Sequence, residues 1–323
     1  MVINKTVTCY DPSDNSVIVA VFFPVGFCTE RNGALAHLTE HCLLELIRRD
    51  FLPDRLHKPY FLLFNAMTTS YYTCIWFSSP KSCYETHREV FVEAIEQLGE
   101  SIIKLDEVAV NREKNKIINE LHLLKHQFCL EGRTVSDGLL EEQGLNDISI
   151  EEVRSVLNKY TAEGGILFEY GDIECFDETT NEIQNNCVEF VLLDDHRLLI
   201  RNATDPTLIN WGRLISHIAC QKKVAVHFRQ LKSNSMYIGS DETIKNAMNA
   251  LENIDDKQLQ YYIEEYYMRE RVECSDNLEF LKRLYKYYRQ TGKVCNKKTW
   301  YESIYNLPET YKKIIAYVRN NYD

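Results

Sequence analysis

The chain has 323 residues, of which 45% are hydrophobic and 26% are charged, and its formal net charge is −11. This composition is typical of a globular protein, and the length predicts about two domains. The negative charge argues against a nucleic-acid-binding surface. No apolar run reaches the roughly 18 residues that a membrane-spanning helix needs. We therefore expect neither nucleic acid nor a membrane among the partners.

The eleven cysteines are scattered from Cys9 to Cys295 and form no CxxC pair. The first residues, MVINKTVTCYDPSD, lack the positive and apolar regions of a signal peptide. An odd number of cysteines in this context is typical of reduced thiols that pack as small hydrophobic side chains. The sequence therefore predicts a cytoplasmic protein.

The first half of the chain alternates between strand and helix patterns. The segment SVIVAVFFP, residues 16–24, is rich in β-branched and aromatic residues and predicts a buried strand. Ser149, followed three residues later by Glu152, predicts the N-cap of a helix. The other predicted elements are a helix over about 33–50, strands over 60–65 and 71–79, helices over 84–103, 106–129 and 147–160, and a strand over 165–171.

Two domains are predicted, because the segment DETTNEIQNN, residues 177–186, is polar and aperiodic like a linker. Residues 1–176 would form the first domain and residues 187–323 a smaller second one. The second domain begins with two strand patterns and becomes almost wholly helical from about residue 242. The predicted fold class is therefore α+β: a mixed or antiparallel sheet packed with helices, followed by a mostly helical domain. Its two strands are expected over 187–193 and 223–228.

The stretch HLTEH places two histidines and a glutamate inside an apolar helix, where a buried ionisable group needs a partner. At about 100° per residue, His37, Glu40 and His41 lie on one face of that helix. Histidines four residues apart can bind one zinc ion, and the glutamate can accept the proton of a water that zinc activates. Cys42 points about 100° away from His41 and is expected to pack in the core.

A catalytic zinc ion usually has three protein ligands, so two histidines leave the site short of one. The predicted helix over 106–129 offers Glu113 and Glu120, which lie two turns apart on one face. Taken alone, the two glutamates are better explained as solvated charges, and Glu113 could simply pair with Lys116. The residues by themselves leave the third ligand open.

HxxEH is the signature of the pitrilysin/insulysin (inverzincin) metallopeptidases, and the chain resembles this family. The resemblance implies that His37, His41 and Glu120 bind zinc. It also implies that Glu40 is the catalytic base and that Glu113 supports the site. The spacing from His41 to Glu120 is close to that of the family.

A second stretch carries the resemblance further. The segment NAMTTSYYTCIWF, residues 65–77, is similar to the family's edge strand, which takes up a peptide substrate as an added β-strand. Asn65, Ala66 and Thr68 would then bind the substrate. Residues 147–173 are similar to the helix and strand that close a family domain.

The resemblance covers about residues 1–176 and stops there, since the second half is too short for a full second repeat. In the family, a catalytically silent second domain supplies an arginine and a tyrosine that help to bind the substrate carbonyl. Arg229 and Tyr237 have a suitable spacing, but we favour a surface loop for them. A second pitrilysin-like subunit or a homodimer is therefore expected as a partner.

The sequence thus predicts a zinc-dependent endopeptidase that hydrolyses short or unfolded peptides. The maturation of a precursor peptide, and a role as the catalytic half of a heterodimer, are extensions of this prediction. One alternative is a non-catalytic scaffold or peptide-binding subunit with the same fold, which would need none of the HxxEH residues. Another is a small protein with a structural zinc ion, which would need a fourth ligand that is not evident.

Overall fold

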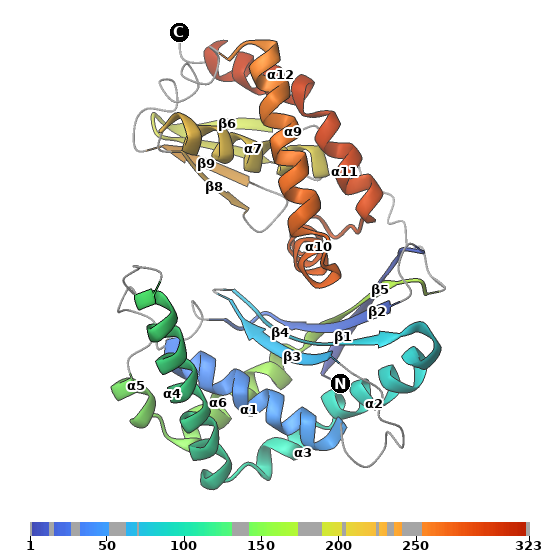
Figure 1. The fold of residues 1–323 in the computed structure, drawn as a ribbon, viewed down its shortest axis with the longest axis vertical. Helices are drawn as coiled ribbons and strands as arrows, with labels where there is room; N and C mark the ends of the chain where they lie inside the picture. Colours follow the sequence, from blue (N-terminus) through green and yellow to red (C-terminus); the bar gives the residue numbers. More distant parts are fainter. Residues whose placement is uncertain are drawn as a thin grey trace. The chain divides into compact units, whose positions relative to one another are not determined.

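The computed structural model divides the chain into two compact units, Met1–Glu174 and Cys175–Asp323 (Figure 1). The predicted linker over 177–186 lies outside the residues that the structure describes. The described residues are 2–12, 16–26, 33–51, 63–69, 71–130, 142–173, 189–201, 205–223, 226–230, 236–240 and 254–320.

The first unit is built on a five-stranded mixed sheet with the order β1-β5-β2-β4-β3 (Figure 1). Its central strand, β2, pairs antiparallel with β5 and β4, whereas β1 pairs parallel with β5. This order makes β3 an edge strand, paired with β4 alone among the strands described. The strands are β1 (Ile3–Tyr10), β2 (Ser16–Phe23), β3 (Leu63–Thr68), β4 (Thr73–Pro80) and β5 (Gly165–Gly171).

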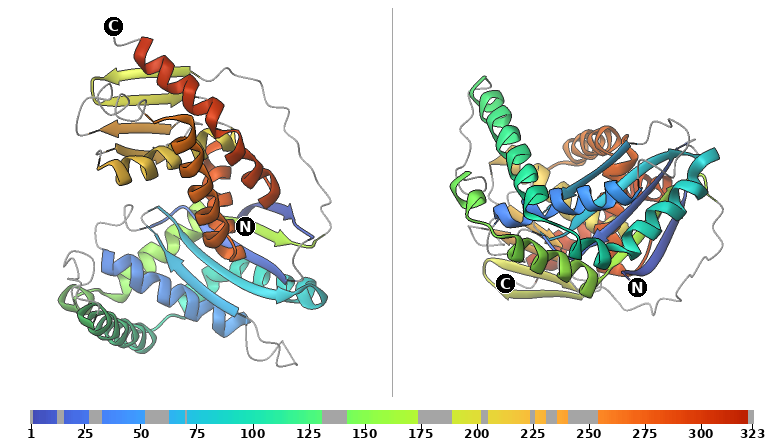
Figure 2. Two further views of the ribbon diagram at one scale, coloured as in Figure 1. Left: turned by 45° about the horizontal axis from the view of Figure 1, so that its top comes forward. Right: turned by 90° about the horizontal axis from the view of Figure 1, so that it is seen from below.

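The helices of this unit lie on one face of the sheet (Figures 1 and 2). Helix α1 occupies the centre of the layer and packs against β3, α2, α4 and α6. The helices are α1 (Gly33–Phe51), α2 (Tyr84–Glu96), α3 (Leu98–Ile103), α4 (Glu107–Leu130), α5 (Glu142–Asn146) and α6 (Ile150–Glu163), and a 3-10 turn spans Lys81–Cys83.

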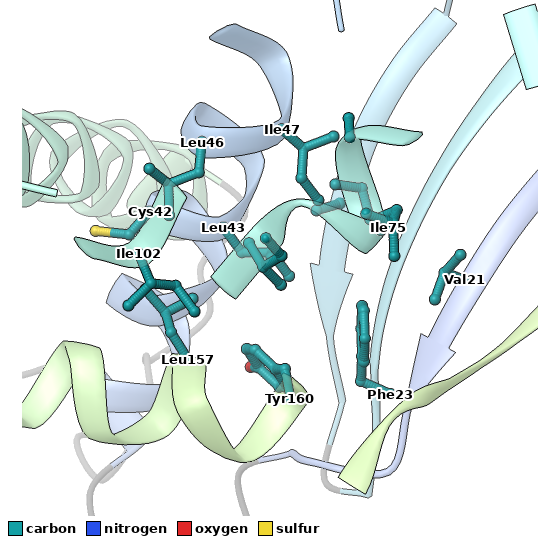
Figure 3. Close-up of a cluster of buried hydrophobic side chains, with 14 of the residues drawn as sticks. Val21, Phe23, Cys42, Leu43, Leu46, Ile47, Ile75, Ile102, Leu157 and Tyr160 are labelled. Atoms are coloured by element: carbon teal, nitrogen blue, oxygen red, sulfur yellow. The ribbon is translucent and has the colours of Figure 1, made fainter. Parts of the chain in front are cut away.

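The core of the first unit lies between α1 and the sheet (Figure 3). Leu43 and Ile47 of α1 belong to the same buried cluster as Val21 and Phe23 of β2 and Tyr160 of α6. Burying one such side chain contributes roughly 1.5–3 kcal/mol, so the cluster holds α1 firmly against the sheet. Cys42 is also fully buried there, as expected from its angle on the helix.

The predicted N-cap of α6 is confirmed. The Ser149 hydroxyl accepts a hydrogen bond from the Glu152 backbone N–H (3.2 Å), and the Glu152 carboxylate accepts one from the Ser149 N–H (2.8 Å). This reciprocal pair is a capping box, which satisfies backbone donors at the start of the helix. The prediction missed β1, and the helix expected over 84–103 is two helices, α2 and α3.

The second unit contains a four-stranded antiparallel sheet with the order β6-β7-β9-β8. Helix α7 packs on β8, and α9, α11 and α12 pack on α7. The sheet has two strands, β7 and β9, that were not predicted, while the helical C-terminal part agrees with the prediction. The elements are β6 (Glu189–Asp194), β7 (Arg197–Arg201), α7 (Pro206–Lys222), β8 (Val226–Gln230), β9 (Met236–Ser240), α9 (Asp256–Glu273), α10 (Asn277–Thr291), α11 (Lys297–Tyr305) and α12 (Leu307–Asn320).

The α+β fold class is therefore confirmed. In the part of the chain that the structure describes, no helix is both long and apolar enough to cross a membrane. Seven cysteines in the described ranges are free thiols, and five of them are buried: Cys9, Cys42, Cys74, Cys274 and Cys295.

Candidate metal centre

Helices α1 and α4 bring three ligand-type side chains together. His37 and His41 lie one turn apart on α1, with ring centroids 4.9 Å from each other. Glu120 reaches both from α4: its Oε2 is 4.0 Å from His37 Nε2 and 3.5 Å from His41 Nε2. Within the described ranges, this is the one group of three His, Cys, Asp or Glu side chains placed to share a metal ion.

The donor set and its spacing fit zinc. One nitrogen from each histidine and one carboxylate oxygen lie within 4.8 Å of one another. Ligands about 2.1 Å from a tetrahedral ion are about 3.4 Å apart, so small side-chain movements bring all three to one ion. Two imidazoles and one carboxylate form a common catalytic zinc set, and they leave the fourth position open.

Glu113 lies behind His41, with its side chain only 3% exposed. Its Oε2 is 3.6 Å from His41 Nδ1, the ring nitrogen opposite the one that faces Glu120. Its Oε1 accepts a hydrogen bond of 2.8 Å from Lys116 Nζ. Glu113 thus makes both the ion pair with Lys116 and the contact with the histidine. A carboxylate at this ring nitrogen orients a metal-binding imidazole and makes it more basic.

Arg112 and Glu45 complete this network, and neither was predicted from the sequence. Glu45 Oε1 accepts a hydrogen bond of 2.6 Å from Arg112 Nη2, and its Oε2 lies 3.9 Å from Lys116 Nζ. Glu45 follows His41 by four residues, so it lies one turn further along α1 on the same face. The four-residue spacing between His41 and Glu45 was the sequence signal that could have predicted the position of Glu45. The network joins α1 to α4, the two helices that carry the metal-binding groups.

The two histidines differ in their electrostatic surroundings. Burial and the neighbouring ring of His41 lower the pKa of His37 to about 4. Burial also acts to lower the pKa of His41, but a hydrogen bond to Glu113 and the charge of Glu120 outweigh it. The net result is a pKa of His41 above its ordinary value. The carboxylates therefore favour a proton on His41 when no metal is bound.

Glu40 lies on the same face of α1 and is 8% exposed. Burial raises the pKa of its carboxyl group above the ordinary value. Two hydrogen bonds from Thr68, one from its hydroxyl and one from its backbone, oppose this rise. A carboxylate with a raised pKa beside a metal site is suited to general base catalysis, because proton transfer is most efficient when the pKa approaches the working pH.

The edge strand β3 presents its backbone next to this group. Thr69 N–H donates to Tyr72 O (2.8 Å), so the alternation of an antiparallel ladder turns the N–H groups of Ala66 and Thr68 away from β4. The Ala66 N–H is hydrogen bonded to the side-chain oxygen of its neighbour Asn65 (2.9 Å). The three residues expected to bind substrate thus lie on an edge strand beside Glu40, at the place that strand addition requires.

Arg229 and Tyr237 do not lie in a loop, so that part of the interpretation is wrong. Arg229 belongs to β8 and Tyr237 to β9, and the two are directly paired in the antiparallel ladder. β8 ends one residue after Arg229, and β9 begins one residue before Tyr237.

Comparisons with known proteins give likenesses in structure only. No family model matches the sequence, and no curated protein matches it. A protein from Alicyclobacillus acidocaldarius assigned to the M16-like peptidases superposes with a TM-score of 0.54 at 12% identity, over 96% of this chain and 91% of the other. A protease from Helicobacter pylori superposes with a TM-score of 0.52 at 12% identity, over 97% of this chain and 95% of the protease chain. A chain of complex III2 from Candida albicans superposes with a TM-score of 0.55 at 10% identity, over 95% of this chain and 90% of the other.

The chain has the fold of the M16-like peptidases. The superpositions extend over nearly the whole chain, so they include the second unit that sequence patterns left unmatched. The second half is therefore not too short for the fold, contrary to the expectation that the resemblance stops near residue 176.

Proposed function

We propose that the protein is a zinc-dependent endopeptidase that hydrolyses short or unfolded peptides. The observation that carries this proposal is the convergence of His37, His41 and Glu120 beside Glu40 and next to an open edge strand. A structural zinc site would need a fourth protein ligand, and no fourth one lies with these three in the described part of the chain. An open position is what a hydrolytic site needs.

In the proposed reaction, His37, His41 and Glu120 hold the zinc ion, which would polarise the scissile carbonyl and acidify a water. Glu40 accepts the proton of the attacking water and returns it to the leaving amine. Glu113 holds the ring of His41 in place from behind. Each proton that Glu40 accepts is delivered to the amine, so the residue ends the cycle ionised, as it began.

The peptide would bind as an added strand along β3. Its carbonyl oxygen would replace the Asn65 side chain as the acceptor of the Ala66 N–H, which points to the open edge. Main-chain pairing of this kind is largely independent of side chains and needs an extended substrate. The proposal therefore specifies short or unfolded peptides. The maturation of a precursor peptide belongs to the same substrate class.

A non-catalytic role with the same fold is the second candidate. One superposed structure is a chain of complex III2 and is not described as a peptidase, yet its TM-score of 0.55 matches the 0.54 of the M16-like peptidase. This likeness favours the non-catalytic role. The convergence of the metal-binding groups favours hydrolysis, since a scaffold needs neither the group nor a buried carboxyl beside it. Pairing with a second pitrilysin-like subunit, or as a homodimer, is compatible with both candidates.

The decisive experiment is the substitution Glu40→Gln. Purified wild-type and variant chains are loaded with zinc and incubated with a mixed peptide library, and cleavage is followed by mass spectrometry. We expect the variant to lose at least about 100-fold in activity while its zinc content is unchanged, because only the proton acceptor is removed. Glu89→Gln, at an exposed position of α2, is the matched control and should be fully active. Zinc-loaded wild-type protein without any cleavage would favour the scaffold.

A further inference from the structure

Helix α9 carries apolar side chains on two opposite faces. One face contributes Ile263 and Tyr266 to the buried core of the second unit, where α9 packs against α7 and α11 (Figure 1). The other face carries Tyr261, Met268 and Val272, which are 63%, 60% and 70% exposed. At about 100° per residue, these three side chains lie within about 40° of one another, opposite the buried face. They form one line along the helix, which we call the α9 stripe.

The α9 stripe differs from ordinary exposed apolar residues because its members are aligned. Single exposed apolar side chains are normal on a protein surface, whereas contiguous ones mark an interaction site. Among the described residues, ten large apolar side chains are exposed, and three of them form this stripe. A fourth, Tyr305 of the neighbouring helix α11, packs its ring 5.0 Å from that of Tyr267 on α9. The spacing of seven and then four residues within the stripe is the pattern of a helix that pairs with another helix.

The charges beside the stripe are complementary to those of a second copy of the same helix. Glu264 and Arg271 are exposed and flank the stripe on one side, about 60° and 80° from Tyr261. If two copies of α9 pack antiparallel about a twofold axis near the middle of the helix, Glu264 of each copy meets Arg271 of the other. In the same register, Tyr261 lies within one turn of Val272 of the other copy, and the two Met268 side chains meet near the axis. Parallel packing would instead bring like charges together.

The neighbouring polar groups leave the stripe open. Glu265 has nearly the same angle on the helix, but its carboxylate accepts a hydrogen bond from Gln221 of α7 (3.0 Å) and is drawn to that side. Arg271 Nη1 donates to the hydroxyl of Tyr267 (3.2 Å), and its guanidinium carbon lies 5.3 Å from the ring centroid of Tyr301 on α11. These contacts hold the guanidinium of Arg271 beside the helix. Less side-chain freedom is then lost when Arg271 pairs with a second copy.

We propose that two copies of this chain associate through the α9 stripe, packed antiparallel, with Glu264 of each copy paired to Arg271 of the other. The inference goes beyond the proposed function and does not depend on it. Helix α9 has 18 residues and is therefore about 27 Å long. A contact of this length buries an area at the low end of specific interfaces, so we expect a dissociation constant in the micromolar range. The protein should then be a monomer when dilute and a dimer when concentrated.

Charge reversal in the whole chain tests both the surface and the orientation, with sedimentation velocity from about 1 to about 300 μM as the measurement. Glu264→Lys and Arg271→Glu each place like charges against one another twice in the dimer, and we expect each to weaken dimerisation about tenfold. The double variant restores both ion pairs with the signs exchanged and should dimerise like the wild type. An equimolar mixture of the two single variants should form a heterodimer, because each contact then joins opposite charges.

Two further variants separate the stripe from general effects. Glu89→Lys makes the same change in net charge as Glu264→Lys, but at an exposed position of α2 in the first unit, and should dimerise like the wild type. Met268→Lys leaves the flanking charges in place and brings two ammonium groups together near the axis. We expect it to remain monomeric at about 300 μM. Because Met268 is exposed, this substitution tests the inference even if Arg271→Glu disturbs the packing of α9 against α11.

Several outcomes would overturn the inference. A wild-type chain that is monomeric at about 300 μM has no such interface. A dimer that survives both Met268→Lys and the single charge reversals is held together by another surface. If the mixture of single variants dimerises but the double variant does not, the helices pack parallel. None of these measurements needs zinc or a peptide, so their results are separate from those on hydrolysis.

Discussion

Neighbouring histidines of the candidate site are predicted to titrate far apart in the metal-free protein. His37 has its pKa lowered to about 4, mainly by burial, so it is neutral at any pH above 5. His41 has its pKa raised above 6.5, because the surrounding carboxylates outweigh its burial. Only neutral imidazole binds zinc, so zinc binding near pH 6 should release a proton from His41 and none from His37. Apparent zinc affinity should therefore fall as the pH drops below the pKa of His41.

Two measurements check this prediction. NMR titration of the histidine ring signals gives both pKa values, and calorimetry of zinc binding in buffers with different ionisation enthalpies counts the released protons. Glu113→Gln removes the carboxylate that is hydrogen bonded to His41, so the pKa of His41 should fall in this variant. Two histidines that titrate together near 6.5 would contradict the prediction.

At the scale of residues, sequence and structure contributed different parts of the site. His37, Glu40 and His41 could be predicted from the residues, because helical spacing alone places them on one face. Glu120 could not be predicted in this way, because the residues alone were equally well explained by a solvated charge on the helix. Only the family resemblance selected Glu120 as a ligand. The hydrogen bond between Glu45 and Arg112 was missed entirely. It depends on how α1 packs against α4, which periodicity within one element does not contain.

At the scale of elements, Lys114 fixes the helix that carries Glu113 and Glu120. Its side chain enters the interior from α4, and Nζ donates to the backbone oxygens of Ile148 (2.6 Å) and Asn146 (3.2 Å) just before α6. Lys114→Met would keep the apolar part of the side chain and leave these oxygens without their donor. The loss of a partner for a buried polar group costs about 1–3 kcal/mol. We expect the free energy of unfolding to fall by about this amount and zinc affinity to weaken, because α4 is loosened.

Urea unfolding and a competitive zinc titration measure the two effects. Lys104→Met, at an exposed position after α3, is the control and should change neither quantity. Unaltered stability in Lys114→Met would show that Lys114 does not fix α4.

Elements with a strong pattern were predicted from the sequence, and those with a weak pattern were not. β2 was recognised because its run of apolar residues is buried on both faces, from Val17 to Phe23. β1 was missed because Asn4, Lys5 and Thr6 are exposed in succession, which hides the alternation of a strand. β7 was missed because its short apolar run LLI lies between two exposed arginines, and β9 because its apolar run stops after Ile238.

At the scale of the whole molecule, the two units have separate hydrophobic cores. One buried cluster joins α1 to the first sheet, and the other centres on α7, including the fully buried Trp211. All the groups of the candidate metal centre lie in the first unit. A chain with two cores can unfold in two steps, and a ligand stabilises only the step that destroys its site.

Zinc should therefore raise the temperature of one calorimetric unfolding transition and leave the other where it is. At a free zinc concentration of 100 times Kd, linkage predicts a stabilisation of about 2.7 kcal/mol for the first unit. A chelator should reverse the shift, and His41→Ala should abolish it without moving the second transition. If zinc shifts neither transition, the side chains of His37, His41 and Glu120 do not form a metal site. If the protein shows a single transition that zinc shifts as a whole, the two cores unfold as one cooperative body despite their separate packing.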